Sequence, residues 1–316
     1  MSAAEPIPAF VNARGGSADA ARAAVEADGR FQLHALEPTA LDDALRAAVA
    51  AGTPRVVVSG GDGTLTSAAR VLAGSQTALA VLPGGTLNHF ARDLGLPADD
   101  PAACLDVAAS GEARPVDAAT VNGTLFLGTS SVGAYINFVR TRERLEAWGL
   151  GYRVASVLSA AWSWLRLRGY SVVVRAGERA GDAERRYASP LIFVAVGERQ
   201  LAGDAVGARA VGGAAALHLM VLRTRSRAGV VASLLRAAAA GGVESLARTD
   251  ALDVALVEAC EVALPRRWGR VALDGELVPM TAPLHYRMAR GALLAVVPPG
   301  AAVAGAAPPD GEDRAA

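Results

Sequence analysis

Short β-branched runs alternate with alanine-rich stretches over the first 125 residues, and this alternation constrains the fold more than any other feature of the chain. Strands are predicted at 7–12, 31–35, 55–59 and 78–82, and helices at 18–27, 41–50, 65–72 and 87–94. Strands that alternate with helices pair in parallel, because each helix carries the chain back along the sheet. The sequence therefore predicts an N-terminal α/β domain, in which helices flank a parallel sheet.

After about residue 121 the pattern changes to β-type runs separated by turns. These runs lie at 124–127, 170–175, 191–196, 215–222, 253–264, 270–273 and 292–297, and helical stretches interrupt them at 153–167 and 228–240. Strands without crossover helices pair mostly antiparallel. We expect an α/β domain at 1–122, a mostly antiparallel β domain at 123–295 and a flexible tail at 301–316. A return of the chain to the first domain at 296–300 is left open.

The charged residues exclude several classes of function. The 31 basic residues balance 31 acidic ones, and a net charge of zero argues against a nucleic-acid partner. All 31 basic residues are arginine, so mechanisms that need a Walker-type lysine or a Schiff-base lysine are excluded. The two cysteines and four histidines are scattered, and no metal-ligand spacing emerges from them.

The expected location is cytoplasmic, because neither a signal-like start nor an apolar run of about 18 residues is found. Residues 126–175 hold 7 arginines and 2 acids, a difference of +5, and three of the four tryptophans. Arginine beside interfacial aromatic residues is typical of proteins that rest on an anionic membrane. Tryptophans that fill a core would give the same composition. Two interpretations therefore stay open: the protein contacts the inner face of the membrane peripherally, or its tryptophans lie in a core.

The clearest chemical motif follows the third predicted strand, where 55–64 reads RVVVSGGDGT. Gly60, Gly61 and Gly63 would let backbone N–H groups approach a phosphate, and the N-terminus of the next helix adds partial positive charge. Asp62 repels an anion, so its place among such amides makes sense if it holds Mg²⁺, directly or through water, or if it orients the reacting groups. A tight turn with Asp62 as a helix cap is the alternative.

Two more glycine loops follow neighbouring strands. The segment 82–97 reads LPGGTLNHFARDLGLP, and its loop contains Gly84, Gly85, Thr86 and Asn88. The segment 12–16 ends the first strand, and its loop contains Asn12, Arg14, Gly15 and Gly16. The carboxyl ends of parallel strands meet at one edge of a sheet, so the three loops are expected to line one ligand site. Arg14 is a candidate cation for phosphates, with a solvated arginine as the alternative.

A late acidic motif, LDGE at 273–276, places Asp274 and Glu276 two residues apart. In an extended strand both carboxylates would project to one side. Gly275 allows a turn instead, and a β-turn with solvated acids is the simpler interpretation of this motif alone.

Together these motifs resemble the diacylglycerol kinase catalytic-domain family of bacterial lipid kinases, which has sphingosine and ceramide kinases as relatives. The resemblance covers roughly residues 7–299. It rests on the Asn12 loop, SGGDGT at 59–64, the 82–97 motif, GLGYRVASVLSA at 149–160 and LDGE at 273–276.

The resemblance implies a two-domain kinase that uses ATP and Mg²⁺ to phosphorylate a hydroxyl of diacylglycerol or a related lipid. The α/β domain at 1–122 would be its nucleotide-binding domain, and 123–295 would be a β-sandwich lipid-substrate domain. The expected nucleotide contacts come from the three loops and one further threonine: Asn12, Arg14, Gly15, Gly16, Thr39, Gly60, Gly61, Gly63, Thr64, Thr66, Gly84, Gly85, Thr86 and Asn88. Glu276 is the expected general base, Asp274 orients the reacting groups or binds metal, and Asp62 holds Mg²⁺; the roles of Asp274 and Glu276 could be exchanged.

The chain departs from the family pattern at three places. Thr66-Ser67 stands where relatives continue with Asn-Glu, which bears on the contacts around the catalytic metal, and His89 stands where many have aspartate. Gly212 and Gly213 lie where many bacterial relatives have an Asp-Asp-Gly run that binds a supporting Mg²⁺. This second metal site is predicted to be absent.

Two other functions remain open on the sequence. A nicotinamide dinucleotide kinase-like enzyme shares the Gly-Gly-Asp-Gly loop but would need a different second motif. A non-catalytic lipid- or nucleotide-binding protein would keep the fold and lose turnover. The acceptor also stays open among diacylglycerol, phosphatidylglycerol, ceramide and sphingoid bases, because apolar pockets discriminate by only ~1–3 kcal/mol per methylene.

Overall fold

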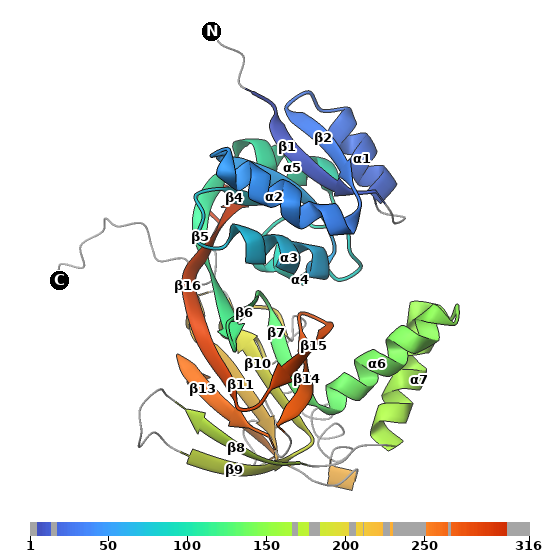
Figure 1. The fold of residues 1–316 in the computed structure, drawn as a ribbon, viewed down its shortest axis with the longest axis vertical. Coiled ribbons are helices and arrows are strands. Elements are labelled where there is room, and N and C mark those ends of the chain that lie inside the picture. Colours follow the sequence, from blue (N-terminus) through green and yellow to red (C-terminus); the bar gives the residue numbers. More distant parts are fainter. Residues whose placement is uncertain are drawn as a thin grey trace, which may run out of the picture.

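In the computed structural model the predicted alternation of strands and helices builds an N-terminal lobe (Figure 1). The structure describes residues 5–13, 18–165, 170–176, 184–201, 207–210, 212–223, 228–229, 251–264 and 267–301. The N-terminal elements are β1 (Ile7–Asn12), α1 (Ala18–Glu26), β2 (Phe31–Leu36), the 3₁₀ helix η1 (Pro38–Ala40), α2 (Leu41–Ala50), β3 (Arg55–Gly60), α3 (Asp62–Leu72), β4 (Ala78–Pro83), α4 (His89–Asp93) and α5 (Pro101–Ser110).

The second half of the chain is mostly strands. Its elements are β5 (Glu112–Val121), β6 (Thr124–Phe126), β7 (Thr129–Gly133), α6 (Ala134–Ala147), α7 (Tyr152–Leu165), β8 (Tyr170–Ala176), β9 (Glu184–Ser189), β10 (Leu191–Val196), β11 (Leu217–Leu222), β12 (Leu252–Val257), β13 (Ala259–Ala263), β14 (Trp268–Leu273), β15 (Glu276–Thr281) and β16 (Leu284–Val297).

The N-terminal strands pair in parallel in the order β2-β1-β3-β4. The sequences of β3 and β4 are nearly continuous apolar runs because helices cover both faces of the sheet. Helix α2 packs on α3, and α1 packs on α5. The connection from β1 to β2 runs in one direction across the sheet, and those from β2 to β3 and from β3 to β4 run in the opposite direction. Because such crossovers are right-handed, α1 with α5 and α2 with α3 lie on opposite faces of the sheet. The predicted α/β fold is confirmed.

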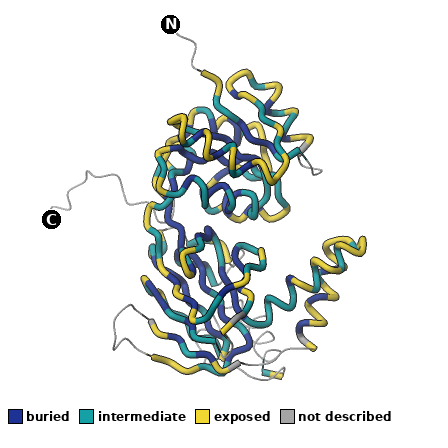
Figure 2. The backbone as a smooth tube through the Cα atoms, viewed as in Figure 1, coloured by how far each residue is buried: buried dark blue, intermediate teal, exposed yellow. Residues whose placement is uncertain are grey.

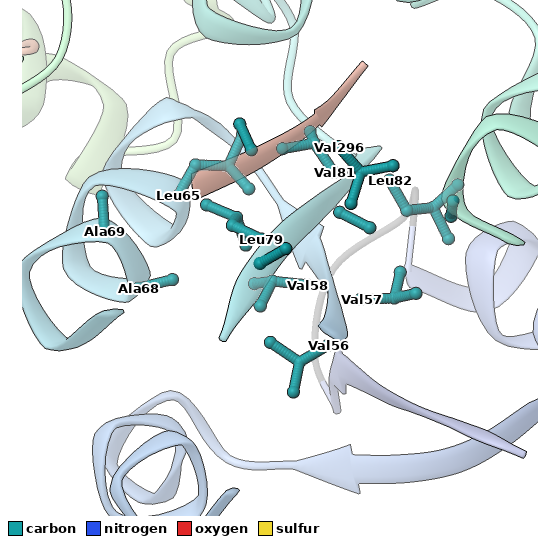
Figure 3. Packing of buried hydrophobic residues seen from close by; sticks show 14 of the residues in the cluster. Val56, Val57, Val58, Leu65, Ala68, Ala69, Leu79, Val81, Leu82 and Val296 are labelled. Atoms are coloured by element: carbon teal, nitrogen blue, oxygen red, sulfur yellow. The ribbon is translucent and has the colours of Figure 1, made fainter. Parts of the chain in front are cut away.

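The core of this lobe lies between β3, β4 and the helices that cover them (Figure 3). Val57, Val58 and Leu79 from the strands and Leu65 from α3 are all fully buried. The last strand, β16, joins the same cluster through Val296.

Strand β16 continues the parallel sheet into the C-terminal lobe. It pairs in parallel with β4 at Ala295, antiparallel with β5 over most of its length, and antiparallel with β13 near its start. The sheet order is therefore β2-β1-β3-β4-β16-β13-β8-β9, so one sheet belongs to both lobes.

A second sheet, in the order β12-β11-β10-β7-β14-β15, is antiparallel throughout and confirms the antiparallel sheet predicted for the C-terminal part. Its inner side and the C-terminal part of the first sheet enclose a separate core. Tyr286 lies fully buried there, edge-on to Phe126, and its hydroxyl is hydrogen-bonded to the Ser130 hydroxyl at 3.0 Å. Burial raises the pKa of Tyr286, and the Ser130 bond acts in the opposite direction.

Several predicted elements were wrong in extent. The run predicted as one strand at 253–264 breaks at Glu258, so that β12 lies in the antiparallel sheet and β13 in the shared sheet. Helix α3 begins at Asp62 rather than at Leu65, because the glycine loop itself forms the first helical turn. Helices α5 and α6 were not predicted. The start of α5 had a usable signal, because Asp100 before Pro101 is a typical helix-capping pattern. In the structure the Asp100 carboxylate accepts the N–H of Ala103.

Helices α6 and α7 form an antiparallel hairpin that projects from the side of the C-terminal lobe (Figure 1). Most of the predicted helix at 228–240 lies outside the described residues. Within the described part of the chain, no helix has the length and apolar character that crossing a membrane requires.

Leu79 tests the placement of β4 at the centre of the N-terminal core. Leu79→Ala removes a fully buried side chain, so we expect the free energy of unfolding to fall by about 2–5 kcal/mol in urea titrations followed by circular dichroism. Leu256→Ala on β12 is the control, because this side chain is 43% exposed, and it should stay within about 0.5 kcal/mol of the native protein. Equal stabilities of the two variants would contradict this core.

Candidate functional site

Two glycine loops pack backbone against backbone at the carboxyl ends of β3 and β4. The N–H of Gly84 donates to the carbonyl of Gly60 at 2.9 Å. A Cβ atom on Gly85 would lie 2.8 Å from the Cα of Gly61, and one on Gly84 would lie 3.2 Å from the Cα of Gly60. Only glycine permits this approach, so the glycines of the two motifs allow the two loops to pack backbone against backbone.

Polar side chains fix the second loop against the N-terminus of α3. Asn88 has a φ of 49°, and its Oδ1 accepts the N–H of Gly85 at 2.9 Å. Asp62 is the first residue of α3, and its Oδ1 accepts the N–H of Phe90 at 3.1 Å. Asp62 thus joins α3 to α4, and no other described residue is hydrogen-bonded to its carboxylate.

A cavity of about 220 Å³ opens beside the first loop, at the carboxyl ends of β1 and β3. In the order β2-β1-β3-β4, the connection after β1 leads to one side of that strand, and β3 lies on its other side. The gap between β1 and β3 is therefore the topological switch point, where open α/β sheets bind their ligands. The cavity is lined by Phe10, Val11, Asn12, Leu36, Glu37, Pro38, Leu41, Ser59, Gly63, Thr64, Ser67 and Glu276.

Glu276 is the lining residue that comes from the C-terminal lobe. It is exposed, and its carboxylate lies against the first turn of α3: a Cβ atom on Gly63 would be 2.6 Å from its Oε1. The absence of a side chain at Gly63 therefore makes room for Glu276. A carboxylate from one lobe and a helix N-terminus from the other meet in one cavity.

Asp274 and Glu276 are arranged differently. Asp274 and Gly275 form the two-residue turn between β14 and β15, with φ values of 48° and 90°, which corresponds to the Asp-Gly hairpin turn. The turn suggested as the simpler interpretation is present, but its aspartate is only partly exposed and is hydrogen-bonded to the protein.

The Asp274 carboxylate accepts four hydrogen bonds. Oδ1 accepts the N–H groups of Gly128 and Thr129 at 2.8 and 2.9 Å. Oδ2 accepts the N–H of Leu127 at 2.8 Å and the hydroxyl of Thr66 at 2.9 Å. Four donors occupy the acceptor sites of a carboxylate, so this side chain joins the turn to α3 and to the backbone before β7.

The structure brings some predicted nucleotide residues together and separates others. Asn12, Gly63 and Thr64 line the cavity. Thr39 lies exposed in η1 and is not a lining residue, and Thr66 is buried against Asp274. The loop positions Gly60, Gly61, Gly84, Gly85, Thr86 and Asn88 form the two packed loops beside it, where Thr86 is exposed. Arg14, Gly15 and Gly16 lie outside the described residues.

Sequence reasoning missed several lining residues, among them Glu37, Ser59 and Ser67. Glu37 directly follows β2, and residues just after parallel strands gather at the ligand edge, so its position was a usable signal. Ser67, one of the departures from the family pattern, donates to Asp42 of α2 at 2.9 Å. That contact depends on how two helices pack, which the motif spacing does not reveal.

The segment at 212–214 lies beside a carboxylate that the sequence did not single out. The N–H of Ala214 donates to Glu198 Oε2 at 2.9 Å. Within the described residues, no group of three or more His, Cys, Asp and Glu side chains lies close enough together to hold a metal ion.

A buried ion pair connects the lobes close to the second loop. Arg199, after β10, donates to Asp93 of α4 at 2.8 Å, and the two side chains are 5% and 9% exposed. Arg199 also donates to the carbonyl of Val196 at 2.9 Å.

Two nearby groups have lowered pKa values. Burial lowers the pKa of Arg209, with a smaller contribution from the positive charge of Arg199, and burial also lowers the pKa of His218.

Sequence comparisons connect this arrangement to known kinases. A family model described as the diacylglycerol kinase catalytic domain matches residues 6–121. The protein named "Probable lipid kinase YegS-like" from Pseudomonas aeruginosa (strain UCBPP-PA14) is 32% identical over 266 residues, which cover 80% of this chain and 80% of that protein. A diacylglycerol kinase from Mycobacterium tuberculosis (strain ATCC 25618 / H37Rv) is 37% identical over 111 residues. That match covers 34% of this chain and 36% of the relative, about a third of its length.

Known structures share the fold. A diacylglycerol kinase from Bacillus anthracis str. Sterne superposes with a TM-score of 0.63 at 16% identity, over 93% of this chain and 97% of that chain. A second chain from the same organism gives a TM-score of 0.68 at 19% identity, over 93% and 98%. These superpositions establish the fold alone. The family comes from the long match to the P. aeruginosa protein together with the family model, and it confirms what the motifs indicated: the chain belongs to the diacylglycerol kinase catalytic-domain family of lipid kinases.

Proposed function

We propose that this protein transfers the γ-phosphoryl group of ATP to a hydroxyl of diacylglycerol or a related lipid. One observation carries the proposal: Glu276 of the C-terminal lobe lies against Gly63, in the cavity beside the glycine loop and the N-terminus of α3. Phosphoryl transfer to an alcohol needs a phosphate site and a carboxylate that accepts the hydroxyl proton.

The nucleotide phosphates would lie at the glycine loop, near the first turn of α3. Helix N-termini offer unpaired N–H groups and partial positive charge to anions. The cavity of about 220 Å³ is smaller than the ~300–1,000 Å³ of most ligand pockets, so it would hold only part of ATP.

The carboxylates beside the proposed phosphate site suit a divalent cation. Glu276 lines the cavity, and Asp62 is the first residue of α3, whose next two residues line it. Mg²⁺ commonly binds through one or two carboxylates and substrate phosphates while it keeps several waters. Asp62 fits this donor set, because Phe90 is hydrogen-bonded to only one of its two oxygens. When bound, Mg²⁺ would neutralise the negative charge of the phosphates.

Glu276 would accept the proton of the lipid hydroxyl while that oxygen attacks the γ-phosphorus, and ADP would leave. Asp274 has a different role in this proposal. Its four hydrogen bonds fix the turn before β15 and therefore the position of Glu276. Asp274 is a positioning residue, and Thr66 supports it from α3 rather than contacting the nucleotide.

Two other functions can be separated from this one by assay. A dinucleotide kinase-like enzyme would phosphorylate NAD, whereas a non-catalytic binding protein would bind lipid or nucleotide without turnover. Radiolabelled ATP is offered to the protein with NAD and with a total lipid extract, and the labelled product is identified. Label in a lipid supports the proposal and names the acceptor; label in NAD or in neither contradicts it.

Replacement of Glu276 tests the general base. Glu276→Gln keeps the shape but cannot take a proton, so kcat should fall by ~10²–10⁴-fold while the KM for ATP changes little. Glu258→Gln is the control, since this carboxylate pairs with Arg290 on the surface. Near-native kcat in Glu276→Gln would remove Glu276 from the reaction.

Asp274→Asn tests the positioning role. Asparagine tolerates the positive φ, but its NH₂ group must face an N–H or hydroxyl donor on one side. We expect a loss of about 1–3 kcal/mol in the free energy of unfolding, a lower kcat, and an unchanged Mg²⁺ concentration for half-maximal activity. Thr66→Val, which removes one of the four donors, should show a smaller loss of both.

A direct role in metal binding predicts another result. Asp274→Asn would then raise the required Mg²⁺ concentration strongly, and Thr66→Val would leave it unchanged. These two results together would show that Asp274 is a metal ligand and not a positioning residue.

Gly85→Ala tests the contact between the two loops. The new Cβ atom would lie 2.8 Å from the Cα of Gly61, so the loops must separate, and displacements near 1 Å cost turnover by up to ~10²-fold. Gly29→Ala is the matched control, because nothing lies within 4 Å of its added Cβ. ATP binding by calorimetry and kcat are compared in both variants. Native values in Gly85→Ala would show that the loop contact does not shape the site.

A further inference from the structure

Large apolar side chains are exposed mainly on the α6–α7 hairpin. Nine described large apolar residues are exposed, and two of them, Leu87 and Leu256, lie elsewhere. The other seven lie on the hairpin: Trp148, Tyr152, Val154, Val157, Leu158, Trp162 and Leu165. Their concentration on one projecting element marks an interaction surface rather than scattered surface residues.

Helix α7 presents its large residues to solvent and its small ones to α6. Ala155, Ser159 and Ser163 recur every four residues and are buried, at 0%, 0% and 7% exposure. The exposed stripe, which contains Val154, Val157, Leu158, Trp162 and Leu165, follows the i, i+3, i+4 spacing of one helix face. A surface helix of a globular protein usually shows the opposite arrangement, which makes this stripe a candidate contact surface.

The shape of the hairpin suits a fluid partner. The hairpin stands away from the body of the C-terminal lobe, and exposed residues lie along α7 and the second half of α6 (Figure 2). Trp148, 77% exposed, lies at the turn between the helices. A projecting helix edge inserts readily into a lipid interface, where tryptophan and tyrosine rings are favoured.

The charge of the hairpin points to anionic lipid. Residues 134–165 contain 4 arginines and 2 glutamates, a difference of +2. Arg140, Arg144 and Arg153 are exposed. Arg142 is positioned over the rings of Phe138 and Tyr152, at 5.8 and 5.4 Å. Exposed arginines beside an apolar stripe can bind lipid phosphates while the stripe enters the acyl boundary.

We propose that the outer face of the α6–α7 hairpin docks this protein on the surface of an anionic bilayer. The exposed stripe of α7 and Trp148 would enter the interface, with the arginines at the level of the headgroups. This assigns Trp148, Trp162 and the exposed arginines of the hairpin to a membrane surface, not to a core.

Docking would also bring the reaction site to the bilayer. Helix α6 contacts β14 and β15, and Asp274 lies in the turn between these two strands while Glu276 begins β15. If the protein is the lipid kinase proposed above, the docked α6–α7 hairpin places Glu276 near the bilayer that contains its acceptor. The docking surface itself does not depend on that activity.

Vesicle sedimentation tests the apolar face without ATP or turnover. Wild-type protein should bind vesicles of phosphatidylglycerol and phosphatidylcholine, and Val157→Ser with Leu158→Ser should weaken binding by at least ~10-fold. Leu256→Ser, an exposed apolar residue on β12, is the control and should bind like wild type. A blue shift of tryptophan emission on binding should shrink in Trp148→Phe.

A second comparison tests the charges. Arg144→Gln with Arg153→Gln should reduce binding and its dependence on salt, since exposed charges are screened beyond ~8 Å at physiological ionic strength. Arg46→Gln on α2, which is also exposed but lies in the other lobe, should leave binding unchanged.

Two results would overturn the docking surface. One is vesicle binding by the Val157→Ser, Leu158→Ser variant that equals wild type. The other is a wild-type dimer in light scattering that the same variant converts to monomer, without vesicle binding by either, which would assign the face to a second copy of the chain. Failure of the kinase proposal would appear separately, as absence of turnover on a short-chain, water-soluble lipid that needs no bilayer.

Discussion

The arrangement of the two lobes depends on β16, which is a strand of both. Its C-terminal part completes the parallel sheet beside β4, and its N-terminal part pairs with β13 in the other lobe. Strand β5 runs antiparallel to it almost throughout. Backbone hydrogen bonds along one continuous ribbon restrain rotation between the lobes far more than a flexible linker would, and a site made by residues from both lobes therefore keeps a defined geometry.

Two carboxylates add side-chain connections to that ribbon. Asp93 of α4 pairs with buried Arg199, and Asp274 accepts the hydroxyl of Thr66 from α3 together with three backbone N–H groups. Loss of one partner from a buried charge pair is strongly destabilising, because the other charge is left without compensation. Both connections meet the N-terminal lobe next to the glycine loops. Side-chain contacts between the lobes therefore lie beside the proposed phosphate site.

The alternation of strands and helices was enough to predict the N-terminal fold, because parallel strands buried on both faces leave continuous apolar runs such as those of β3 and β4. The break at Glu258 was not predictable from composition, since β12 and β13 are both strand-forming and only their partners differ. At the site, the glycine loops and Glu276 were found by motif. Glu37 and Ser67 were not, because their places in the cavity depend on how β2, α2 and α3 pack.

The different surroundings of Asp274 and Glu276 follow from one turn. An Asp-Gly pair with positive φ at both residues reverses the chain within two residues, so the aspartate side chain faces the backbone before β7 and the glutamate begins the next strand. Had both residues stood in one extended strand, the two carboxylates would project side by side, and their negative charges would repel each other. The turn avoids this repulsion: four donors stabilise the charge of Asp274, while Glu276 reaches the cavity opposite a glycine. A structural and a reactive carboxylate can thus stand two residues apart in one motif.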